Sequence, residues 1–223
     1  GKEDDSPPQG DSLERFTPDL PQDEIDRFFA DPLGTAADHL GTATTRIIYE
    51  LDRYQQSGQP VYAATLARET HGSNPVPTDG LKVQVSFLYS DGFGRELQTK
   101  IQAEPGLAPA RDGAGHLRRD DAGALIEEET DSRWVGNGRT IYNNKGKPVK
   151  QYEPFFSGTH QYETEADLVE WGVTPILFYD PVERVVATLH PNKTYEKVVF
   201  DPWQQISYDA NDTVIYTKIS KET

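Results

Sequence analysis

Alternating apolar and polar residues mark the strands that this 223-residue sequence predicts. In LKVQVSFLYS (81–90), single polar residues separate Val83, Val85 and Phe87, which is the pattern of a strand with one buried face. The turn sequence DGFG (91–94) follows, and then a second strand-like run, RELQTKIQAE. These two runs predict an antiparallel hairpin.

Two further strand-like runs lie upstream, TATTRIIYELDRY and QPVYAATLARET, and QQSG lies at their junction. Ser-Gly between β-branched or aromatic runs is a hairpin signal. After Pro175 the same alternation of strand-like runs and turn residues continues, with no helical pattern. The sequence therefore predicts a mainly β fold of repeated antiparallel hairpins.

Helical patterns are short. Residues 23–40 carry apolar residues interrupted by Pro32 and Gly34, which predicts one or two helical turns. A second helix is predicted at 165–171, with Thr164 as its N-cap and Gly172 after its C-terminus.

Changes in composition predict four segments. Residues 1–22 are acidic and rich in proline, which is typical of an arm or linker, and 23–104 hold the helical turns and the first hairpins. Residues 105–132 lose all periodicity and are expected to be a mobile surface insertion, whose truncation leaves the fold intact. Residues 133–223 form a segment of repeated β-hairpins.

Bulk composition excludes several classes of function. The net charge of -15 argues against binding nucleic acid or an anionic membrane, because both require an excess of Lys and Arg. The absence of cysteine excludes disulfides and thiolate metal sites. The sequence also has no methionine, even at its first residue, so we expect a segment of a longer polypeptide.

Candidate catalytic and metal-binding groups have simpler explanations. The five histidines do not fall at metal-ligand spacings. The segments Asp112-Gly113 and Asp209–Asp212 lack the following glutamate that a calcium loop needs. The carboxylates of 127–131 could serve a hydrolase, but a solvated flank of the insertion is expected because a general acid needs an apolar pocket. We therefore expect no enzyme activity, no catalytic residue, no cofactor and no metal.

One turn phrase recurs along the chain. It has an aromatic residue before Asp or Asn in most copies, then Gly or Glu three residues after that Asp or Asn, and then a basic residue. Asp and Asn accept hydrogen bonds from amides two residues on, and glycine supplies a positive φ. The residues assigned to these turns are Asp91, Gly94, Arg95, Tyr142, Asn143, Gly146, Lys147, Tyr179, Asp180, Arg184, Phe200 and Asp201.

This phrase resembles the Rhs/YD repeat. Longer phrases extend the resemblance from about residue 17 to 214, to the region that precedes and enters the Rhs repeats in the B component of insecticidal Tc toxins and in SpvB/TcdB-like proteins. They are GTATTRIIYELDRY, YSDGFGRELQTKIQAEPG, RWVGNGRTIYNNKGKPVKQYEPFFS and FYDPVERVVATLHPNKTYEKVVFDPWQQ. The sequence departs from the repeat at Glu183, where the family usually has glycine, which argues against a tight glycine turn there.

The resemblance implies a structural role in a secreted bacterial toxin. In that family the repeats form a hollow β-sheet shell around a cytotoxic effector, and this segment would belong to the shell wall. The implied partners are the rest of its own polypeptide, the C-component half of the shell with its effector and, indirectly, the pore-forming A component.

A second interpretation from another class remains open. The chain could instead be a stand-alone β-rich module that binds a glycan or a protein partner. Aromatic residues are frequent after Trp134, and the sequence does not separate those that cover sheet faces from those that would line a shell or a sugar-binding face.

Overall fold

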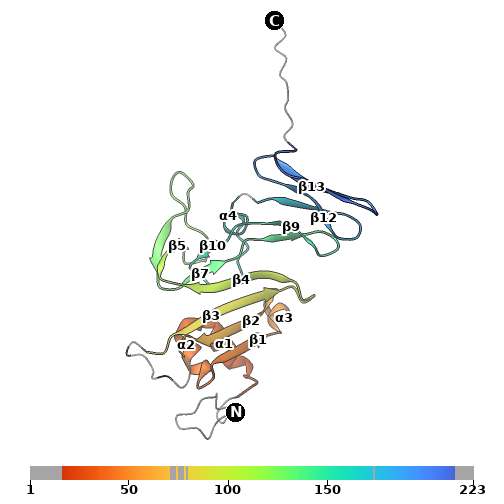
Figure 1. Cartoon of the computed structure of the whole chain (residues 1–223). Coiled ribbons are helices and arrows are strands. Elements are labelled where there is room, and N and C mark those ends of the chain that lie inside the picture. The colour runs from red at the N-terminus through yellow and green to blue at the C-terminus, as the bar shows by residue number, and fades with distance from the viewer. Residues whose placement is uncertain (1–16, 71–73, 75–77, 79, 173, 214–223) are drawn as a thin grey trace. The chain divides into compact units, whose positions relative to one another are not determined.

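The computed structural model describes residues 17–70, 74, 78, 80–172 and 174–213. Most of its regular structure is antiparallel β-sheet, with four short helices in the described part of the chain, so the predicted mainly β fold is confirmed (Figure 1). The chain divides into two compact units. The first contains the residues up to Asn137 together with Phe155–Thr164, and the second contains Gly138–Pro154 and the residues from Glu165 onward.

The first unit is a six-stranded antiparallel sheet with strand order β1-β2-β3-β4-β7-β10. Side chains alternate between a buried and a more exposed face along β1, β2 and β3. The strands are β1 (Thr45–Glu50), β2 (Val61–Arg68), β3 (Val83–Ser90), β4 (Glu96–Ala103), β7 (Arg133–Gly136) and β10 (Phe155–Ser157).

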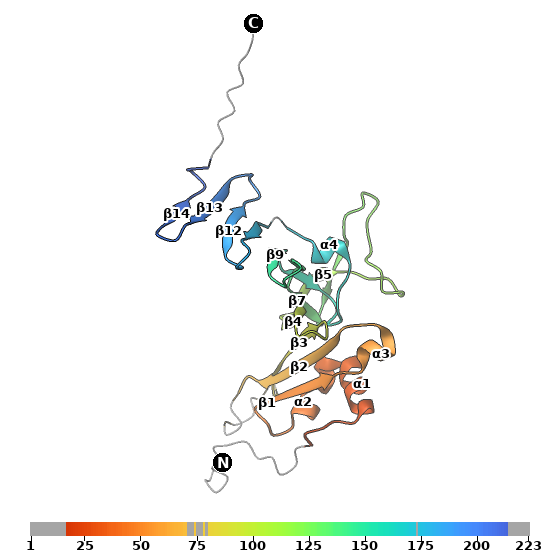
Figure 2. The same cartoon turned by 90° about the vertical axis from the view of Figure 1, so that its right-hand side faces the viewer.

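Two helices, α1 (Gln22–Ala30) and α2 (Pro32–Leu40), lie against one face of this sheet (Figure 2). Asp31 begins α2 by accepting a hydrogen bond from the Gly34 amide at 3.0 Å, and Pro32 fits the first helical turn because its missing N–H is not needed there. The apolar core of the first unit forms between these helices and the sheet, around Phe28, Leu40, Tyr62, Leu66, Val85, Phe87, Tyr89 and Trp134.

The two predicted hairpins of the first unit are present, with one difference. β3 and β4 pair around the turn at Asp91–Gly94. β1 and β2 also pair, but a short helix, α3 (Arg53–Ser57), joins them in place of a tight Ser-Gly turn. Gly58 ends this helix at φ 69°, where its amide donates to the Tyr54 carbonyl.

Residues 105–132 were predicted to lack regular structure. In the structure, residues 106–130 form a short strand pair that carries two backbone loops, and we call this segment the cloverleaf. Its stem is the pair β5 (Gly106–Pro109) and β6 (Glu127–Thr130), and two closed loops follow each other between these strands. At the junction each of three residues donates to the next around a ring: Ala110 to Ile126 at 2.8 Å, Ile126 to Arg118 at 3.0 Å, and Arg118 to Ala110 at 2.9 Å. Backbone hydrogen bonds can therefore order this segment with little apolar core.

The second unit is a separate six-stranded antiparallel sheet with strand order β14-β13-β12-β11-β9-β8. Its strand residues are half-buried or exposed, and none is buried. The strands are β8 (Thr140–Tyr142), β9 (Pro148–Gln151), β11 (Ile176–Tyr179), β12 (Val185–Leu189), β13 (Tyr195–Phe200) and β14 (Gln205–Tyr208).

Two features around the second unit differ from the sequence prediction. The helix expected at 165–171 is only α4 (Ala166–Val169). Its N-cap residue is Glu165 in place of Thr164, and no side chain caps it. Trp134, predicted to open the repeat segment, lies in β7 of the first sheet. The second sheet begins at Thr140 instead.

Candidate functional site

The recurring aspartate turn has one geometry, seen most fully at Asp180. The Asp180 amide donates to the Arg184 carbonyl at 2.9 Å, which closes a five-residue loop between β11 and β12. One carboxylate oxygen, Oδ1, accepts from the amides of Val182 at 3.0 Å and Arg184 at 2.9 Å. A single side chain therefore binds the amides that a strand partner cannot reach.

The same bonds form around Asp91, between β3 and β4, and around Asn143, between β8 and β9. Asp91 Oδ1 accepts from the amides of Phe93 and Arg95 at 2.9 and 3.1 Å. Asn143 Oδ1 accepts from the amides of Lys145 and Lys147 at 2.9 and 3.0 Å.

Arginine completes two of these turns. Arg184 Nε donates to Asp180 Oδ2 at 2.7 Å, and Arg95 Nε donates to Asp91 Oδ2 at 2.6 Å. Desolvation of each carboxylate raises its pKa, but the hydrogen bonds from the arginine and the backbone together outweigh it, so both pKa values lie below their ordinary value. Both carboxylates are therefore held ionised, as turn acceptors.

In the turns at Asp91, Asn143 and Asp180, the third residue after the Asp or Asn has a positive φ. Gly94 and Gly146 lie at φ 80° and 76°, where glycine meets no steric penalty. Glu183 occupies the equivalent position at φ 69°, so the turn keeps its shape although the glycine is absent. Its amide donates to the Asp180 carbonyl at 3.0 Å, as the Gly146 amide does to Asn143.

Three of the four predicted turns, 143–147, 180–184 and 201–204, lie at the same end of the second sheet, because their strands are adjacent and antiparallel. Tyr179 Oη donates to the Pro148 carbonyl at 2.7 Å. Lys147 pairs with Glu183 at 3.0 Å.

The third turn of this group is joined to its neighbour through Arg184, whose guanidinium lies 4.0 Å from the centre of the Phe200 ring. The Asp201 turn itself is one residue shorter, because the Asp201 amide donates to the Gln204 carbonyl. Tyr142 ends β8 opposite Pro148. The fourth turn, with Asp91, Gly94 and Arg95, belongs to the first unit and is not part of this group.

Sequence reasoning missed two further turns of this kind, both in the cloverleaf. Asp112 Oδ1 accepts from the amides of Ala114 and His116, and Asp120 Oδ1 accepts from the amides two and four residues on, all at 2.8–2.9 Å. The signal was present as a tandem octapeptide, ARDGAGHL followed by RRDDAGAL, which places Asp and Gly three residues apart in both copies. Each arginine before the aspartate donates to the glycine carbonyl of its own loop.

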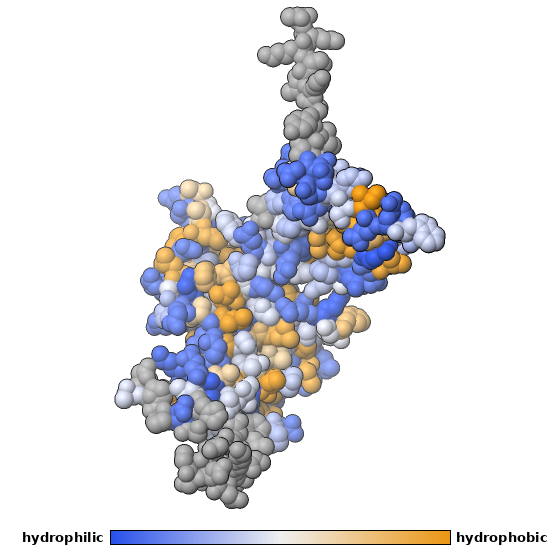
Figure 3. Space-filling model, viewed as in Figure 1, coloured by the Kyte–Doolittle hydropathy of each residue, from blue (hydrophilic) through white to orange (hydrophobic). Residues whose placement is uncertain are grey.

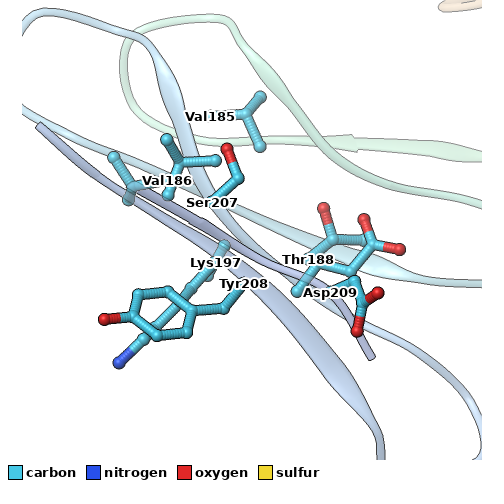
Figure 4. Close-up of a pocket in the computed structure, with 10 residues that line it drawn as sticks. Val185, Val186, Thr188, Lys197, Ser207, Tyr208 and Asp209 are labelled. Carbon is cyan, nitrogen blue, oxygen red and sulfur yellow. The ribbon is translucent and has the colours of Figure 1, made fainter. Parts of the chain in front are cut away.

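A shallow groove of about 480 Å³ runs along β12, β13 and β14. Figure 4 shows apolar Val185 and Val186 at one part of it and polar Thr188 and Asp209 at another. Lys197 Nζ lies 4.6 Å from the centre of the Tyr208 ring. The hairpins of the second sheet also carry exposed apolar side chains: Phe178, Val185, Val199, Trp203 and Ile206. Figure 3 shows hydrophobic residues in orange on the surface of this part of the chain.

The acidic run that could have served a hydrolase lies at the surface, in β6. The 127–129 carboxylates are exposed, and Glu128 is paired with Arg118, which differs from two carboxylates facing each other in an apolar pocket. No group of three or more potential metal ligands occurs in the part of the chain that the structure describes. Among these residues no helix is long and apolar enough to cross a membrane.

The first unit contains a buried polar cluster that the sequence did not indicate. Lys100, fully buried in β4, donates to the Thr159 carbonyl at 3.1 Å. Burial lowers its pKa to about 7, against the opposing effect of Glu163. Glu163 is itself buried and paired with Arg111 of the cloverleaf. Gln98 exchanges two hydrogen bonds with the Glu163 backbone, at 2.8 and 3.3 Å.

Comparison with known proteins gives similarity to one group of structures. No protein-family model and no curated protein matches the chain. The crystal structure of TcdB2-TccC3 matches with a TM-score of 0.59 and 27% identity over 76% of this chain. That of TcdB2-TccC3-Cdc42 matches with a TM-score of 0.52 and 25% identity over 88%, and the Photorhabdus luminescens Tc holotoxin pore matches with 0.53 and 24% over 88%.

The chain therefore has the fold of part of a Tc toxin B/C component. It spans only 8% to 10% of the length of these matched chains.

Proposed function

We propose that this chain is a non-catalytic wall segment of an Rhs/YD-repeat shell in a Tc-type toxin. In this role it helps to enclose and deliver a cytotoxic effector as part of a secreted complex. Its partners are the remainder of its own polypeptide, the C-component half of the shell with the effector and, indirectly, the pore-forming A component. It contacts neither nucleic acid nor membrane.

The observation that carries this proposal is the extent of the structural match. Similarity to the TcdB2-TccC3 structures runs over 76% to 91% of this chain but over only 8% to 10% of the matched chains. A match of this kind is expected for a segment of a much larger wall.

The second sheet supports the same proposal. Its strands have no buried side chain, and its outermost strands, β8 and β14, have a partner on one side only within the described residues. A sheet without a covered face gains little apolar burial, and open strand edges favour pairing with further strands. The role of the aspartate turns in this proposal is structural, since they close hairpins and join neighbouring ones.

A chimera tests the proposal. The matched segment of TcdB2 is replaced by this chain, and the chimera is co-purified with TccC3. We expect a complex in which the amides of β12, β13 and β14 exchange hydrogen at least tenfold more slowly than in the isolated chain, because the wall covers and extends the second sheet.

The isolated chain provides the control. A monomer that unfolds in one sharp transition, with β12–β14 as well protected alone as in the chimera, would show a self-contained module and contradict the shell role. The binding-module interpretation then predicts saturable glycan binding that Tyr208→Ala, in the groove, weakens.

A further inference from the structure

A short segment of the first unit, which we call the strap (residues 158–163), is fixed to the sheet mainly through its backbone. Tyr89 Oη of β3 donates to the His160 carbonyl at 2.8 Å, and Lys100 Nζ of β4 donates to the Thr159 carbonyl at 3.1 Å. Gln98 holds the far end of the strap through its two bonds to Glu163. The strap has no helix or strand of its own, so these tethers and the side chains beneath them decide whether it stays in place.

The side chain beneath the centre of the strap is the imidazole of His160, which is only 7% exposed. Three aromatic rings surround it: Phe29 of α1 with its centre at 4.7 Å, Phe87 of β3 at 5.0 Å and Trp134 of β7 at 5.6 Å. Nε2 is buried and has no hydrogen-bond partner. This surrounding suits a neutral imidazole, and a proton on Nε2 would create an unpaired, buried, charged donor.

Charged groups around the imidazole do not supply that missing partner. Lys100 of β4 and Arg53 of α3 both repel a positive charge on His160, and only Asp31, between α1 and α2, attracts it. A hydrogen bond to the Phe29 backbone favours the charged form, but burial dominates and lowers the pKa of His160 to about 4. The other carboxylate of this region, Glu163, is paired with Arg111 at the end of the strap.

We propose that protonation of His160 releases the strap from the first sheet, so that acid opens this part of the unit. The ring cannot leave its aromatic surroundings while the strap is tethered. A protonated ring cannot stay there, because its Nε2 has no acceptor. Opening the strap transfers the imidazolium to water and breaks the Tyr89 and Lys100 tethers together. This device does not depend on the proposed shell function, because it uses only residues of the first unit.

The direction and size of the pH effect on strap opening follow from the difference in the pKa of His160 between the closed and open states. A released His160 takes its ordinary pKa of 6.5, so the open strap binds a proton in a pH range where the closed strap does not. Acid therefore favours opening below pH 6.5, and the gain ends near the lowered pKa. Between pH 7 and pH 5, the open population is expected to rise roughly 20-fold.

Amide hydrogen exchange of the 223-residue chain tests this directly. Protection factors of residues 158–163, corrected for the intrinsic effect of pH on exchange, should fall roughly 20-fold between pH 7 and pH 5 in the native chain. In His160→Phe, which keeps an aromatic ring but cannot titrate, the fall should be less than threefold. If the phenylalanine prevents folding, His160→Gln provides a second variant that cannot titrate.

Two control variants separate the device from general acid weakening. His39→Gln removes another buried histidine of the first unit. It should leave the pH-dependent fall in the protection factors of the strap unchanged. Tyr89→Phe removes one tether and should lower protection equally at both pH values. Equal protection at pH 7 and pH 5 in the native chain, or an unchanged fall in both His160 variants, would overturn the proposal.

Discussion

At the scale of single residues, the aspartate turns are held by local bonds and not by burial in a core. Asp180 binds two amides and an arginine that all lie within four residues of it. Such a turn forms from its own sequence, which explains how it can recur in both units and in the cloverleaf. The turn also forms without glycine, since Glu183 adopts φ 69° at the position that glycine occupies in the turns at Asp91 and Asn143.

Glycine at position 183 should stabilise the β11–β12 hairpin relative to alanine. The left-handed region disfavours a residue with Cβ by about 1 kcal/mol. The free energy of unfolding of the hairpin should therefore be higher in Glu183→Gly than in Glu183→Ala by about that amount. Both variants lose the exposed pair with Lys147, which cancels from this comparison. Exchange of the β11 and β12 amides measures the difference, and equal stability of the two variants would contradict the steric reason.

Gly136 is the residue of β7 that admits a neighbouring ring. A Cβ there would lie 2.5 Å from the Phe155 ring, whereas one at Gly158 would meet nothing closer than 4.0 Å. Gly136→Ala should therefore lower the free energy of unfolding of the first unit by about 1–3 kcal/mol. Urea unfolding followed by Trp134 fluorescence measures it, with Gly158→Ala as the matched control. A loss of equal size at both positions would show that the ring contact is not responsible.

Lys100 should make the first unit more stable in mild alkali. Because its pKa is lowered from 10.5 to about 7, the unfolded chain binds a proton that the folded chain has released, so the free energy of unfolding rises above pH 7. Urea unfolding at pH 7 and pH 9.5, followed by Trp134 fluorescence, should show this rise. Lys100→Met should abolish it, and persistence of the rise in that variant would assign it to another group.

At the scale of elements, the cloverleaf shows that backbone pairing can replace a core. Its two loops repeat one octapeptide, and its three-residue junction satisfies backbone groups that would otherwise need strand partners. Its stem end is nonetheless connected to the first unit. Ala108 and Ala110 are buried, and Arg111 is paired with the buried Glu163. We therefore expect that removal of residues 105–132, which was predicted to leave the fold intact, lowers the stability of the first unit.

Deletions of different length should separate the loops from the stem. Removing 118–125 deletes one octapeptide and lets Ala110 still meet Ile126, so the free energy of unfolding should change by less than about 0.5 kcal/mol. Removing 105–132 leaves the buried Glu163 carboxylate without its arginine. This deletion should lower the free energy of unfolding of the first unit by several times that amount. Urea unfolding followed by Trp134 fluorescence compares them, and equal stability of the two deletions would show that the stem contributes nothing.

At the scale of the whole chain, the two units differ in what stabilises them. The first has an aromatic core between helices and sheet. The second has hairpins joined through turn side chains such as Tyr179 and Arg184, without a buried strand residue. Apolar burial is the main source of folding stability, so the second unit has little stability of its own.

Unfolding of the isolated chain should therefore occur in two steps. Amides of the second sheet should lose protection at lower urea concentration than the transition that Trp134 reports for the first unit. Trp171→Phe and Trp203→Phe, both at exposed positions, remove the other tryptophan signals. Coincident transitions would show that the second sheet is as stable as the first unit. They would argue against the idea that the second sheet needs neighbouring strands of a shell wall for its stability.

The local structure of this protein follows from residues that are close together in its sequence. The alternation of Val83, Val85 and Phe87 identified a half-buried strand, and the spacing of Asp or Asn from Gly identified hairpin turns at Asp91 and Asn143. Both signals depend on residues that are neighbours in the chain, so no tertiary information is needed to detect them. The octapeptide repeat of the cloverleaf was equally local and could have been found.

Which elements contact one another depends on the folded chain and could not be predicted from local patterns. Trp134 lies in the first sheet and not in the second. The strap returns to Lys100, and buries its own His160, after a separate pair of strands has intervened. The residues in these contacts are far apart in the sequence, as Lys100 and Thr159 are. The pattern of apolar and polar residues around each one does not indicate whether it is exposed or buried. Burial then sets their chemistry, because desolvation by the folded chain lowers the pKa values of Lys100 and His160.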